Sequence, residues 1–458
     1  MAFGYRRGPS RDALTDYWSW VVTSASSRMA CDVVVIGAGP AGIAAATRAA
    51  EAGRRVVVLD ESPQVGGQIW RHRPGRVPSG PAARCIARLE RSRAMVERGA
   101  SVVDIVIDPS GNGCAVMAER AGAPLVVQGA ALILATGARE RFLPFPGWTL
   151  PGVIGVGAAQ ALHKTGMSFA GKRVVIAGSG PLLLPVAASL AADGARIALV
   201  AEQASGRDVM RFAAGLWRHP ATLVQAARYR AAFMRTTYAT GQWVTHARGD
   251  GRVQEVIITD GWTSRTMPCD ILCAAFGLVP DTTLARLLGC VVNANGVVVD
   301  ERQETSRLGV YCAGEPTGVG GMELSLVEGE IAGLSAAGRP DEARPLHARR
   351  ASLRASAAAM ARAFALRDEL RSLATPDTIV CRCEDVPLGA VDRGWTTRQA
   401  KLYTRAGMGA CQGRVCGAAL EYLNGWPPDA VRVPAIPVRC STLTSEGTER
   451  VPSATHGA

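Results

Sequence analysis

Lysine is nearly absent from this sequence. Among its 51 basic residues only Lys164, Lys172 and Lys401 are lysines, and the arginines are scattered rather than clustered. The formal net charge of +12 therefore comes without the basic patch or motif that nucleic-acid recognition requires. We expect no nucleic acid among the partners of this protein.

Long apolar runs are missing as well. No stretch reaches the roughly 20 apolar residues that a transmembrane helix needs, and residues 1–28 lack the apolar core and cleavage site of a signal peptide. We therefore expect a cytoplasmic protein without a transmembrane segment. We interpret residues 1–29 as a disordered extension and Met29, which directly precedes the first predicted strand, as the natural start.

Most cysteines of the chain do not belong to a paired-cysteine motif. Eight of the 12 stand alone in apolar or turn contexts, which excludes the dense pattern of a secreted disulfide scaffold. The other four form two close pairs, Cys381 with Cys383 and Cys411 with Cys416. These two pairs are the candidates for metal ligands.

The residues after the N-terminal extension have the pattern of a β-α-β unit. Residues 32–36 and 55–59 are apolar runs of the kind that buried parallel strands produce, and an alanine-rich helix reaching about Glu51 lies between them. The second run ends at Asp60, which Glu61 follows. The turn between the first strand and the helix consists of Gly37, Ala38, Gly39, Pro40, Ala41 and Gly42.

This turn predicts a dinucleotide site. Gly37 permits the tight turn, Gly39 lets the backbone approach a pyrophosphate, and Gly42 allows the helix to pack closely on the strand. Asp60 can accept hydrogen bonds from a ribose diol.

A second unit of the same kind lies further along the chain. Its turn keeps Gly178 and Gly180, but Leu183 takes the place of the third glycine, and Glu202 ends the following strand. Two interpretations remain open. The unit binds NAD or another adenine nucleotide, with Glu202 disfavouring the 2′-phosphate of NADP, or it is a vestigial unit retained for packing.

Three further patterns resemble the glutathione-reductase-like flavoproteins. A glycine pair follows the first acid at residues 66–67, and the superfamily's second and third signatures match residues 134–138 and 309–321. The resemblance implies FAD at the first site, with Glu315 standing where the family usually has the aspartate that contacts the ribityl chain. It adds to the predicted site Gly67, Gln68, Ala135, Thr136, Gly137, Gly314 and Glu315.

The redox-active cysteine pair of the disulfide reductases with this fold is absent. After Gln68 the chain continues with isoleucine, tryptophan and arginine, and Cys269 and Cys273 fall on or beside a predicted buried strand. Thioredoxin-reductase chemistry is therefore not expected. We interpret the isolated His163 as a structural or surface residue.

The two cysteine pairs lie in a module of their own. Four thiolates suit zinc or an iron-sulfur cluster, and the module adds Arg382, Arg405 and Arg414 to offset negative charge. Its glycines, Gly407, Gly409 and Gly413, would let backbone amides approach sulfide. The segment resembles the bacterioferritin-associated-ferredoxin-like domain, which implies a [2Fe-2S] cluster held by Cys381, Cys383, Cys411 and Cys416; zinc or an empty structural site is the alternative.

These patterns together predict an α/β fold with two Rossmann-like dinucleotide-binding domains and a small, mainly α C-terminal iron-sulfur domain. We assign residues 30–150 and 280–340 to the FAD domain and 151–279 to the second dinucleotide-binding domain. A helical linker is expected at 341–375, the iron-sulfur domain at 376–426 and a tail at 427–458.

The order of these parts resembles the α-type subunits of heteromeric amino-acid dehydrogenases, among them opine oxidases, hydroxyproline dehydrogenases, the B subunit of hydrogen cyanide synthase and the α subunit of sarcosine oxidase. The resemblance implies an oxidoreductase that relays electrons between FAD and the cluster. Its partners would be a flavoprotein β subunit that oxidises the amine and a small ferredoxin-like subunit. A self-contained NADH:acceptor reductase and a scaffold with a redox-silent FAD are the alternatives.

Overall fold

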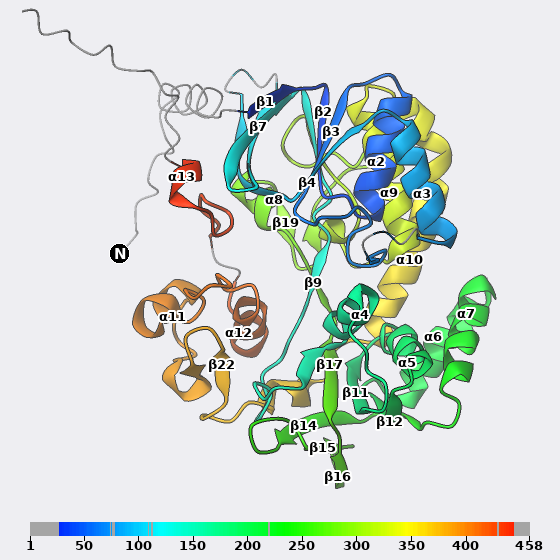
Figure 1. The fold of residues 1–458 in the computed structure, drawn as a ribbon, viewed down its shortest axis with the longest axis vertical. Coiled ribbons are helices and arrows are strands. Elements are labelled where there is room, and N and C mark those ends of the chain that lie inside the picture. Colours follow the sequence, from blue (N-terminus) through cyan, green and yellow to red (C-terminus); the bar gives the residue numbers. More distant parts are fainter. Residues whose placement is uncertain are drawn as a thin grey trace, which may run out of the picture.

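The computed structural model describes residues 27–73, 75, 78–108, 110, 113–218, 220–427 and 430–443. Figure 1 shows two α/β bodies, one above the other, and a small helical module beside them. The upper body contains the first β-α-β unit and the lower body the second. The predicted fold class is confirmed.

A five-stranded parallel sheet of order β21-β8-β2-β3-β4 forms the centre of the upper body. Its middle strands are buried along their whole length because helices and a second sheet cover its two faces. The bounds are β2 Val33–Ile36, β3 Val56–Asp60, β4 Met95–Arg98, β8 Ala131–Leu134 and β21 Val310–Cys312.

Helices cover one face of this sheet (Figure 1). They are α2 (Pro40–Glu51), α3 (Gly80–Arg91) and α9 (Met322–Ala336). Helix α9 lies directly against α2, where a Cβ added to Gly329 or Gly333 would come within 2.3 Å of a backbone oxygen of α2. Only glycine allows the two helices to approach so closely.

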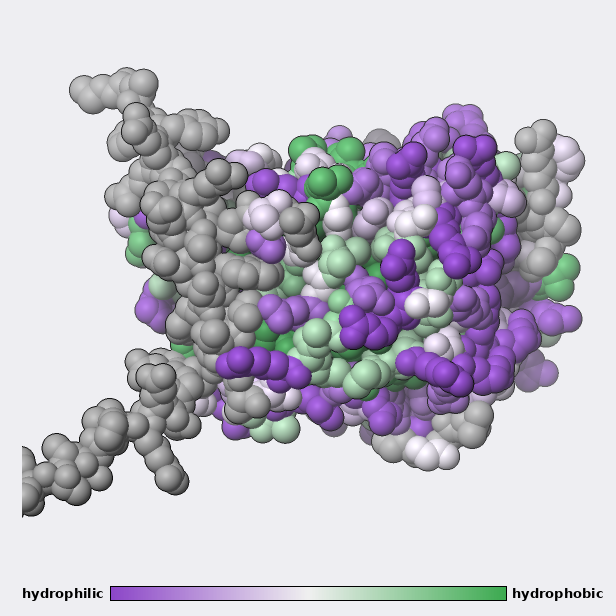
Figure 2. Space-filling model, turned by 90° about the horizontal axis from the view of Figure 1, so that it is seen from above, coloured by the Kyte–Doolittle hydropathy of each residue, from purple (hydrophilic) through white to green (hydrophobic). Residues whose placement is uncertain are grey.

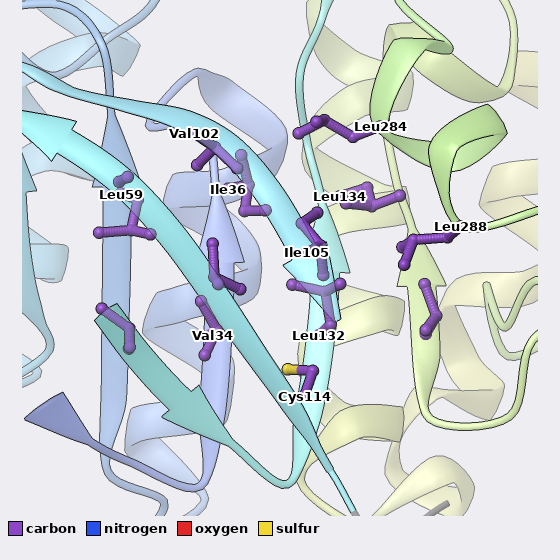
Figure 3. Close-up of a cluster of buried hydrophobic side chains, with 14 of the residues drawn as sticks. Val34, Ile36, Leu59, Val102, Ile105, Cys114, Leu132, Leu134, Leu284 and Leu288 are labelled. Atoms are coloured by element: carbon purple, nitrogen blue, oxygen red, sulfur yellow. The ribbon is translucent and has the colours of Figure 1, made fainter. Parts of the chain in front are cut away.

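A four-stranded sheet of order β1-β7-β6-β5 covers the other face. Figure 3 shows the core between the sheets, in which Val34 and Leu132 face Val102 and Ile105, with Leu284 and Leu288 closing one side. The bounds are β1 Ser27–Ala30, β5 Ala100–Ile107, β6 Cys114–Arg120, β7 Ala123–Gly129 and α8 Thr283–Leu287.

Strand β1 corrects part of the prediction for the N-terminus. Residues 27–29 were assigned to a disordered extension, but they pair in parallel with residues 125–127 of β7. The backbone hydrogen bonds of this edge explain their order. Residues 1–26 lie outside the described residues.

The lower body repeats the design. Its parallel sheet has the order β10-β17-β11-β12-β13, and an antiparallel sheet, β14-β15-β16, lies below it. The strands are β10 Val153–Gly155, β11 Arg173–Ser179, β12 Arg196–Glu202, β13 Tyr238–Thr240, β14 Trp243–Arg248, β15 Glu255–Thr259, β16 Ser264–Pro268 and β17 Ile271–Phe276. The helices are α4 Val156–Thr165, α5 Leu183–Ala192, α6 Gly206–Gly215, η1 Leu216–Arg218 and α7 Pro220–Ala232.

Three connections join the two bodies. Two are the antiparallel strands β9 (Ala138–Glu140) and β18 (Leu278–Pro280). The third is α10 (Arg344–Ala363), which runs from the upper to the lower body in Figure 1. The short elements β19 Val292–Asn293, β20 Gly296–Val297, η2 Glu315–Thr317 and η3 Pro340–Ala343 complete the upper body.

Helix α10 is shorter than the predicted helical linker at 341–375. The helix ends at Ala363, the chain then runs without regular structure to Arg367, and only a 3-10 turn, η4 (Asp368–Ser372), follows. The predicted helix was wrong for residues 364–375, because contacts with the lower body, not local helix preference, determine the conformation of residues 364–367.

The cysteine module consists of a short hairpin and two helices around a small core of its own. Its elements are β22 Ile379–Cys381, β23 Val386–Pro387, η5 Leu388–Ala390, α11 Thr397–Thr404 and α12 Cys416–Asn424. The tail beyond it returns to the upper body, where Ile436 and Val438 pack on the β5-β6-β7 sheet before α13 (Cys440–Leu443).

No helix within the described residues is long and apolar enough to cross a membrane. In the view of Figure 2, hydrophilic residues gather along one side of the molecule, and apolar residues lie in patches between them.

The contact between α2 and α9 yields a stability prediction. Gly333→Ala should lower the free energy of unfolding by about 2 kcal/mol, because the new methyl group overpacks the interface. The matched control is Gly417→Ala in α12, where an added Cβ meets nothing within 4 Å. Urea denaturation of both variants measures the difference, and equal midpoints would contradict the account.

Candidate cofactor sites

The first glycine turn is closed by contacts that only glycine permits. Gly37 has a φ of +101°, and a Cβ there would lie 2.3 Å from the carbonyl oxygen of Ala135. A Cβ on Gly42 would lie 1.8 Å from the carbonyl oxygen of Gly37. Pro40 and Ala41 then begin α2, whose free backbone amides point toward the turn. The turn is therefore shaped to bring a helix N-terminus next to an anion.

Asp60 lies at the end of β3, next to this turn. Its carboxylate accepts hydrogen bonds from the backbone N–H of Ala38, at 2.5 Å, and of Ser62, at 2.7 Å. The side chain is thereby fixed at the place where a ribose would lie in a dinucleotide fold. Glu61 is exposed and points no charge into the buried part of the site.

The second glycine pair lies against the first turn. The N–H of Gly66 donates to the carbonyl oxygen of Ala38, and a Cβ on Gly67 would approach the Cα of Gly39 to 3.0 Å. Gln68 is exposed at the edge of this loop. Two segments that share no chain neighbours thus meet backbone to backbone around the predicted pyrophosphate position.

The second flavin signature follows β8. The hydroxyl of Thr136 donates to the carbonyl oxygen of Asp281, and the N–H of Asp281 donates to the carbonyl oxygen of Gly137. These bonds tie the signature to the segment that follows β18. The signature and one of the connections between the two bodies therefore hold each other in place.

The third signature follows β21. Its Glu315 accepts a hydrogen bond from the N–H of Gly321, the residue before α9, and burial raises the pKa of this carboxyl. The N–H of Gly314 donates to Glu328 of α9 at 3.0 Å. The loop that carries the predicted ribityl contact is thus fixed at two points.

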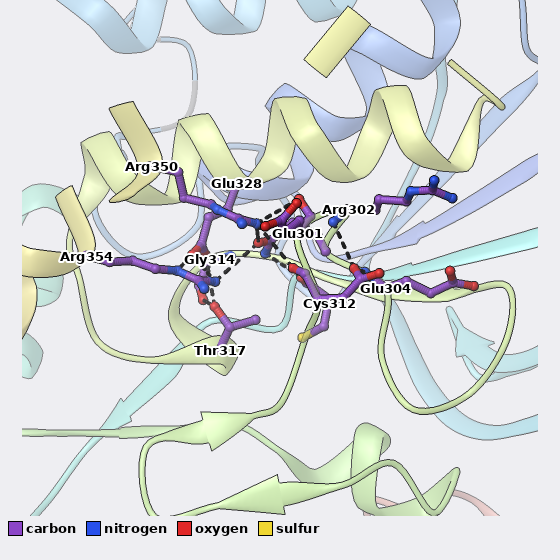
Figure 4. Close-up of polar contacts among 11 residues, drawn as sticks. Glu301, Arg302, Glu304, Cys312, Gly314, Thr317, Glu328, Arg350 and Arg354 are labelled. Atoms are coloured by element: carbon purple, nitrogen blue, oxygen red, sulfur yellow. Dashed lines mark hydrogen bonds and ion pairs between the residues drawn. The ribbon is translucent and has the colours of Figure 1, made fainter. Parts of the chain in front are cut away.

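Glu328 was missed in the sequence. Its side chain is only 1% exposed, and its carboxylate accepts from Gly314, from the hydroxyl of Thr317 and from the guanidinium of Arg354 on α10. Figure 4 shows Arg350 and Arg354 reaching from α10 toward this loop. Helix α9 carries three acids among small and apolar residues, Glu323, Glu328 and Glu330, so the local sequence does not distinguish the one that becomes buried and must find a partner.

Gln303 joins Arg350 to the same network. Its side-chain oxygen accepts from Arg350 at 2.7 Å and from Arg354 at 3.2 Å, and its side-chain nitrogen donates to the carbonyl oxygen of Cys312. The predicted linker helix is therefore bound directly to the loop of the third signature.

The second glycine turn is also tightly built. A Cβ on Gly178 would lie 1.8 Å from the carbonyl oxygen of Ala275. Glu202 is fully buried, and its carboxylate accepts from the N–H of Gly180, at 2.8 Å, and of Ala204, at 2.9 Å. Burial raises the pKa of Glu202 to about 7.

The cysteine module holds the four predicted ligands as two neighbouring pairs and not as one group of four. The thiol of Cys383 neighbours that of Cys411, and the thiol of Cys381 neighbours that of Cys416. Cys381 and Cys416 are buried, whereas Cys383 is exposed. Burial raises the pKa of Cys416 far above that of a free thiol. Across the described residues, no group of three or more His, Cys, Asp or Glu side chains is arranged to hold a metal ion.

The glycines of the module lie against these sulfur atoms. The N–H of Gly407 donates to the Sγ of Cys381 at 3.4 Å, and a Cβ on Gly409 would lie 2.4 Å from the Cβ of Cys383. The guanidinium of Arg405 pairs with Glu384 at 2.6 Å, and its role in offsetting the charge of a cluster stays a prediction. Arg382 and Arg414 are exposed.

A cavity of about 950 Å³ separates the cysteine module from the upper body. Cys416, Gly407 and Gly413 line it on the side of the module. Pro280 and Thr282, which flank the residue bound to the second flavin signature, line the opposite side. The cavity therefore reaches from the cysteines to the connection beside the predicted flavin site.

Known proteins resemble this chain over most of its length. Residues 31–328 match the family described as pyridine nucleotide-disulphide oxidoreductase. The chain belongs to this family. It is an FAD-dependent oxidoreductase of the type found in the A subunit of opine oxidase, in HcnB of hydrogen cyanide synthase and in the alpha subunit of sarcosine oxidase.

Two relatives align with nearly the whole chain. The A subunit of opine oxidase from Rhizobium meliloti is 30% identical over 92% of this chain and 89% of its own length. HcnB of Pseudomonas aeruginosa is 32% identical over 91% of this chain and 99% of its own length. Among solved structures, L-proline dehydrogenase of P. horikoshii shares the fold, with a TM-score of 0.64 at 21% identity, covering 91% of this chain and 80% of its own.

The network around Glu328 makes a testable prediction for this family member. Arg354→Met should lower the free energy of unfolding by about 2 kcal/mol and increase FAD loss on dilution, because it leaves a buried carboxylate without its cation. The control is Arg349→Met, which removes an exposed arginine of the same helix. Flavin fluorescence after gel filtration measures the loss, and equal retention in both variants would refute the role of Arg354.

Proposed function

We propose that the chain is the electron-transferring α-type subunit of a heteromeric dehydrogenase that acts on the CH–NH bond of an amino or imino acid. It would pass electrons between FAD in the upper body and a [2Fe-2S] cluster in the cysteine module. The cavity that Cys416 shares with Pro280 and Thr282 carries this proposal. The cavity extends from one predicted cluster ligand to the two neighbours of Asp281, which is bound to the second flavin signature.

The residues of the upper body fit FAD. Gly37 and Gly42 close the turn at the start of α2, Gly39 leaves room for a pyrophosphate there, and Asp60 lies where a ribose diol would be bound. Gly314 and Glu315 would hold the loop next to the ribityl chain. FAD accepts two electrons as a hydride, whereas a [2Fe-2S] cluster transfers electrons singly.

The cysteine module supplies a donor set that fits the cluster. Cys381, Cys383, Cys411 and Cys416 provide four thiols, the number that a [2Fe-2S] cluster requires. The N–H of Gly407 donates to the Sγ of Cys381, and Gly409 lies against the Cβ of Cys383. Four thiols also suit zinc, which remains the alternative for this module.

The proposed partners follow from the relatives. Their names describe them as subunits, of opine oxidase, hydrogen cyanide synthase and sarcosine oxidase. We propose that this chain likewise works with a flavoprotein β subunit that carries the amine-oxidising site, together with a small ferredoxin-like subunit, in the cytoplasm.

Two other functions would use the same fold. In a self-contained NADH:acceptor reductase, NADH would bind at Gly178, Gly180 and Glu202 and reduce the flavin. In a scaffold subunit, FAD would be redox-silent. The source of the electrons distinguishes the three.

Anaerobic stopped-flow spectroscopy tests the proposed function. The flavin of the purified chain should stay oxidised with NADH, and it should be reduced when the proposed β subunit and the amino acid that it oxidises are added. Rapid reduction of the isolated chain by NADH would instead support the reductase. A flavin reduced by dithionite but by neither physiological route would support the scaffold.

The cysteine module yields a further prediction. Cys411→Ser should remove or destabilise the cluster and leave FAD bound, because the two sites lie in separate parts of the chain. The control is Cys440→Ser, which changes an exposed cysteine outside the module. Iron and acid-labile sulfide assays should give about two of each per chain for the control. Stoichiometric zinc without iron after anaerobic purification would overturn the assignment.

A further inference from the structure

The second glycine turn is in contact with another part of this same chain. Residues 364–367, which we call the anchor segment, lie between the end of α10 and η4 and pass over the turn. The hydroxyl of Ser179, the middle residue of the turn, donates to the carbonyl oxygen of Phe364 at 2.8 Å. A polar group of the turn is therefore hydrogen-bonded to another segment of the same chain.

Gln203 binds the anchor segment more extensively. This side chain, which directly follows Glu202, is fully buried. Its nitrogen donates to the hydroxyl of Ser179 and to the carbonyl oxygen of Ala365, at 2.9 and 3.0 Å, and its oxygen accepts from the N–H of Arg367 at 3.1 Å. All polar atoms of the amide are therefore engaged in holding the segment at the turn.

The start of the following helix also differs between the two turns. Helix α2 begins at Pro40, but α5 begins at Leu183, two residues further from the glycines. Leu183 occupies the place of Gly42, where even a Cβ would collide with the backbone of the turn. The leucine therefore shifts the helix start, and the second turn lacks the regular helix N-terminus that favours a pyrophosphate.

Apolar and cationic contacts hold both ends of the anchor segment. The ring of Phe364 packs edge-on against Phe212, with centroids 5.4 Å apart. The guanidinium of Arg367 lies 4.5 Å from the ring centre of Trp243. These contacts come from the lower body on both sides of the turn.

The anchor segment also contacts the cysteine module. The hydroxyl of Tyr422, on α12, donates to the carbonyl oxygen of Arg367 at 3.1 Å. The guanidinium of Arg371, four residues further on, lies 4.1 Å from the ring centre of Tyr422. Helix α12 begins at Cys416, so the contact leads from the second turn to one of the predicted cluster ligands.

We propose that the second dinucleotide turn is the docking site for residues 364–367 and does not bind a dinucleotide in this protein. Its function is to anchor the linker and, through Tyr422, to position the cysteine module. This inference concerns only binding at the turn and stands independently of the proposed electron transfer. It decides between the two interpretations of the second unit in favour of a structural role.

Nucleotide titration of the purified holoprotein tests the claim that the second turn does not bind a dinucleotide. Isothermal calorimetry with NADH, NAD⁺ and ADP should detect no saturable binding at nucleotide concentrations up to about 1 mM. A dissociation constant in that range corresponds to only weak binding. Saturable micromolar binding of any of the three would overturn the proposal. This outcome does not depend on any variant being stable.

Hydrogen exchange tests the claim that the second turn anchors residues 364–367. Gln203→Ala removes two hydrogen bonds to the anchor segment and a third to Ser179, so the amides of residues 364–367 should exchange about tenfold faster or more. The control is Gln242→Ala, which removes a glutamine of the same body that binds Arg265 instead. Unchanged exchange of the anchor segment in Gln203→Ala would overturn the proposal.

Metal analysis of the same preparations separates this inference from the proposed function. A protein without iron whose anchor segment loosens as expected in Gln203→Ala would contradict the proposed cluster and support the anchor. An iron-containing protein that binds NADH in the micromolar range would contradict the anchor and leave the cluster assignment intact.

Discussion

The buried carboxylate of Glu328 is the interaction on which the arrangement of this molecule depends. A carboxylate with a side chain 1% exposed is strongly unfavourable unless hydrogen bonds and a cation compensate for the lost hydration. Here the N–H of Gly314 and the guanidinium of Arg354 compensate for it. Because Gly314 belongs to the flavin loop and Arg354 to α10, the requirement of one charge fixes the linker helix to the flavin site.

Helix α10 carries this constraint to the rest of the chain. One part of it is bound to the flavin loop, and its end leads into residues 364–367, which Ser179 and Gln203 hold at the second turn. Tyr422 then connects that segment to the helix that begins at Cys416. A continuous series of hydrogen bonds and ion pairs thus links the three parts. Such a fixed geometry suits the proposed transfer between FAD and a cluster, whose positions must be maintained.

Features of this structure that depend on residues close together in the sequence could be predicted from it. Both β-α-β units, their turns and the acids Asp60 and Glu202 follow patterns set by neighbouring residues, and the structure places them as predicted. Glu328 and the anchor segment were not predicted, because their partners lie far away in the chain: Arg354 for the acid, Ser179 and Gln203 for the segment. Helix preference alone extended the linker to residue 375, whereas these distant contacts end it at Ala363.

The proposed function requires that one chain hold both a two-electron and a one-electron carrier. An anaerobic dithionite titration of the purified protein, followed by absorbance and electron paramagnetic resonance, measures this capacity directly. The account predicts uptake of about three electrons per chain, two by FAD and one by the cluster, with a paramagnetic signal from the reduced cluster. Uptake of only about two electrons, without a cluster signal in a protein that retains all four cysteines of the module, would contradict it.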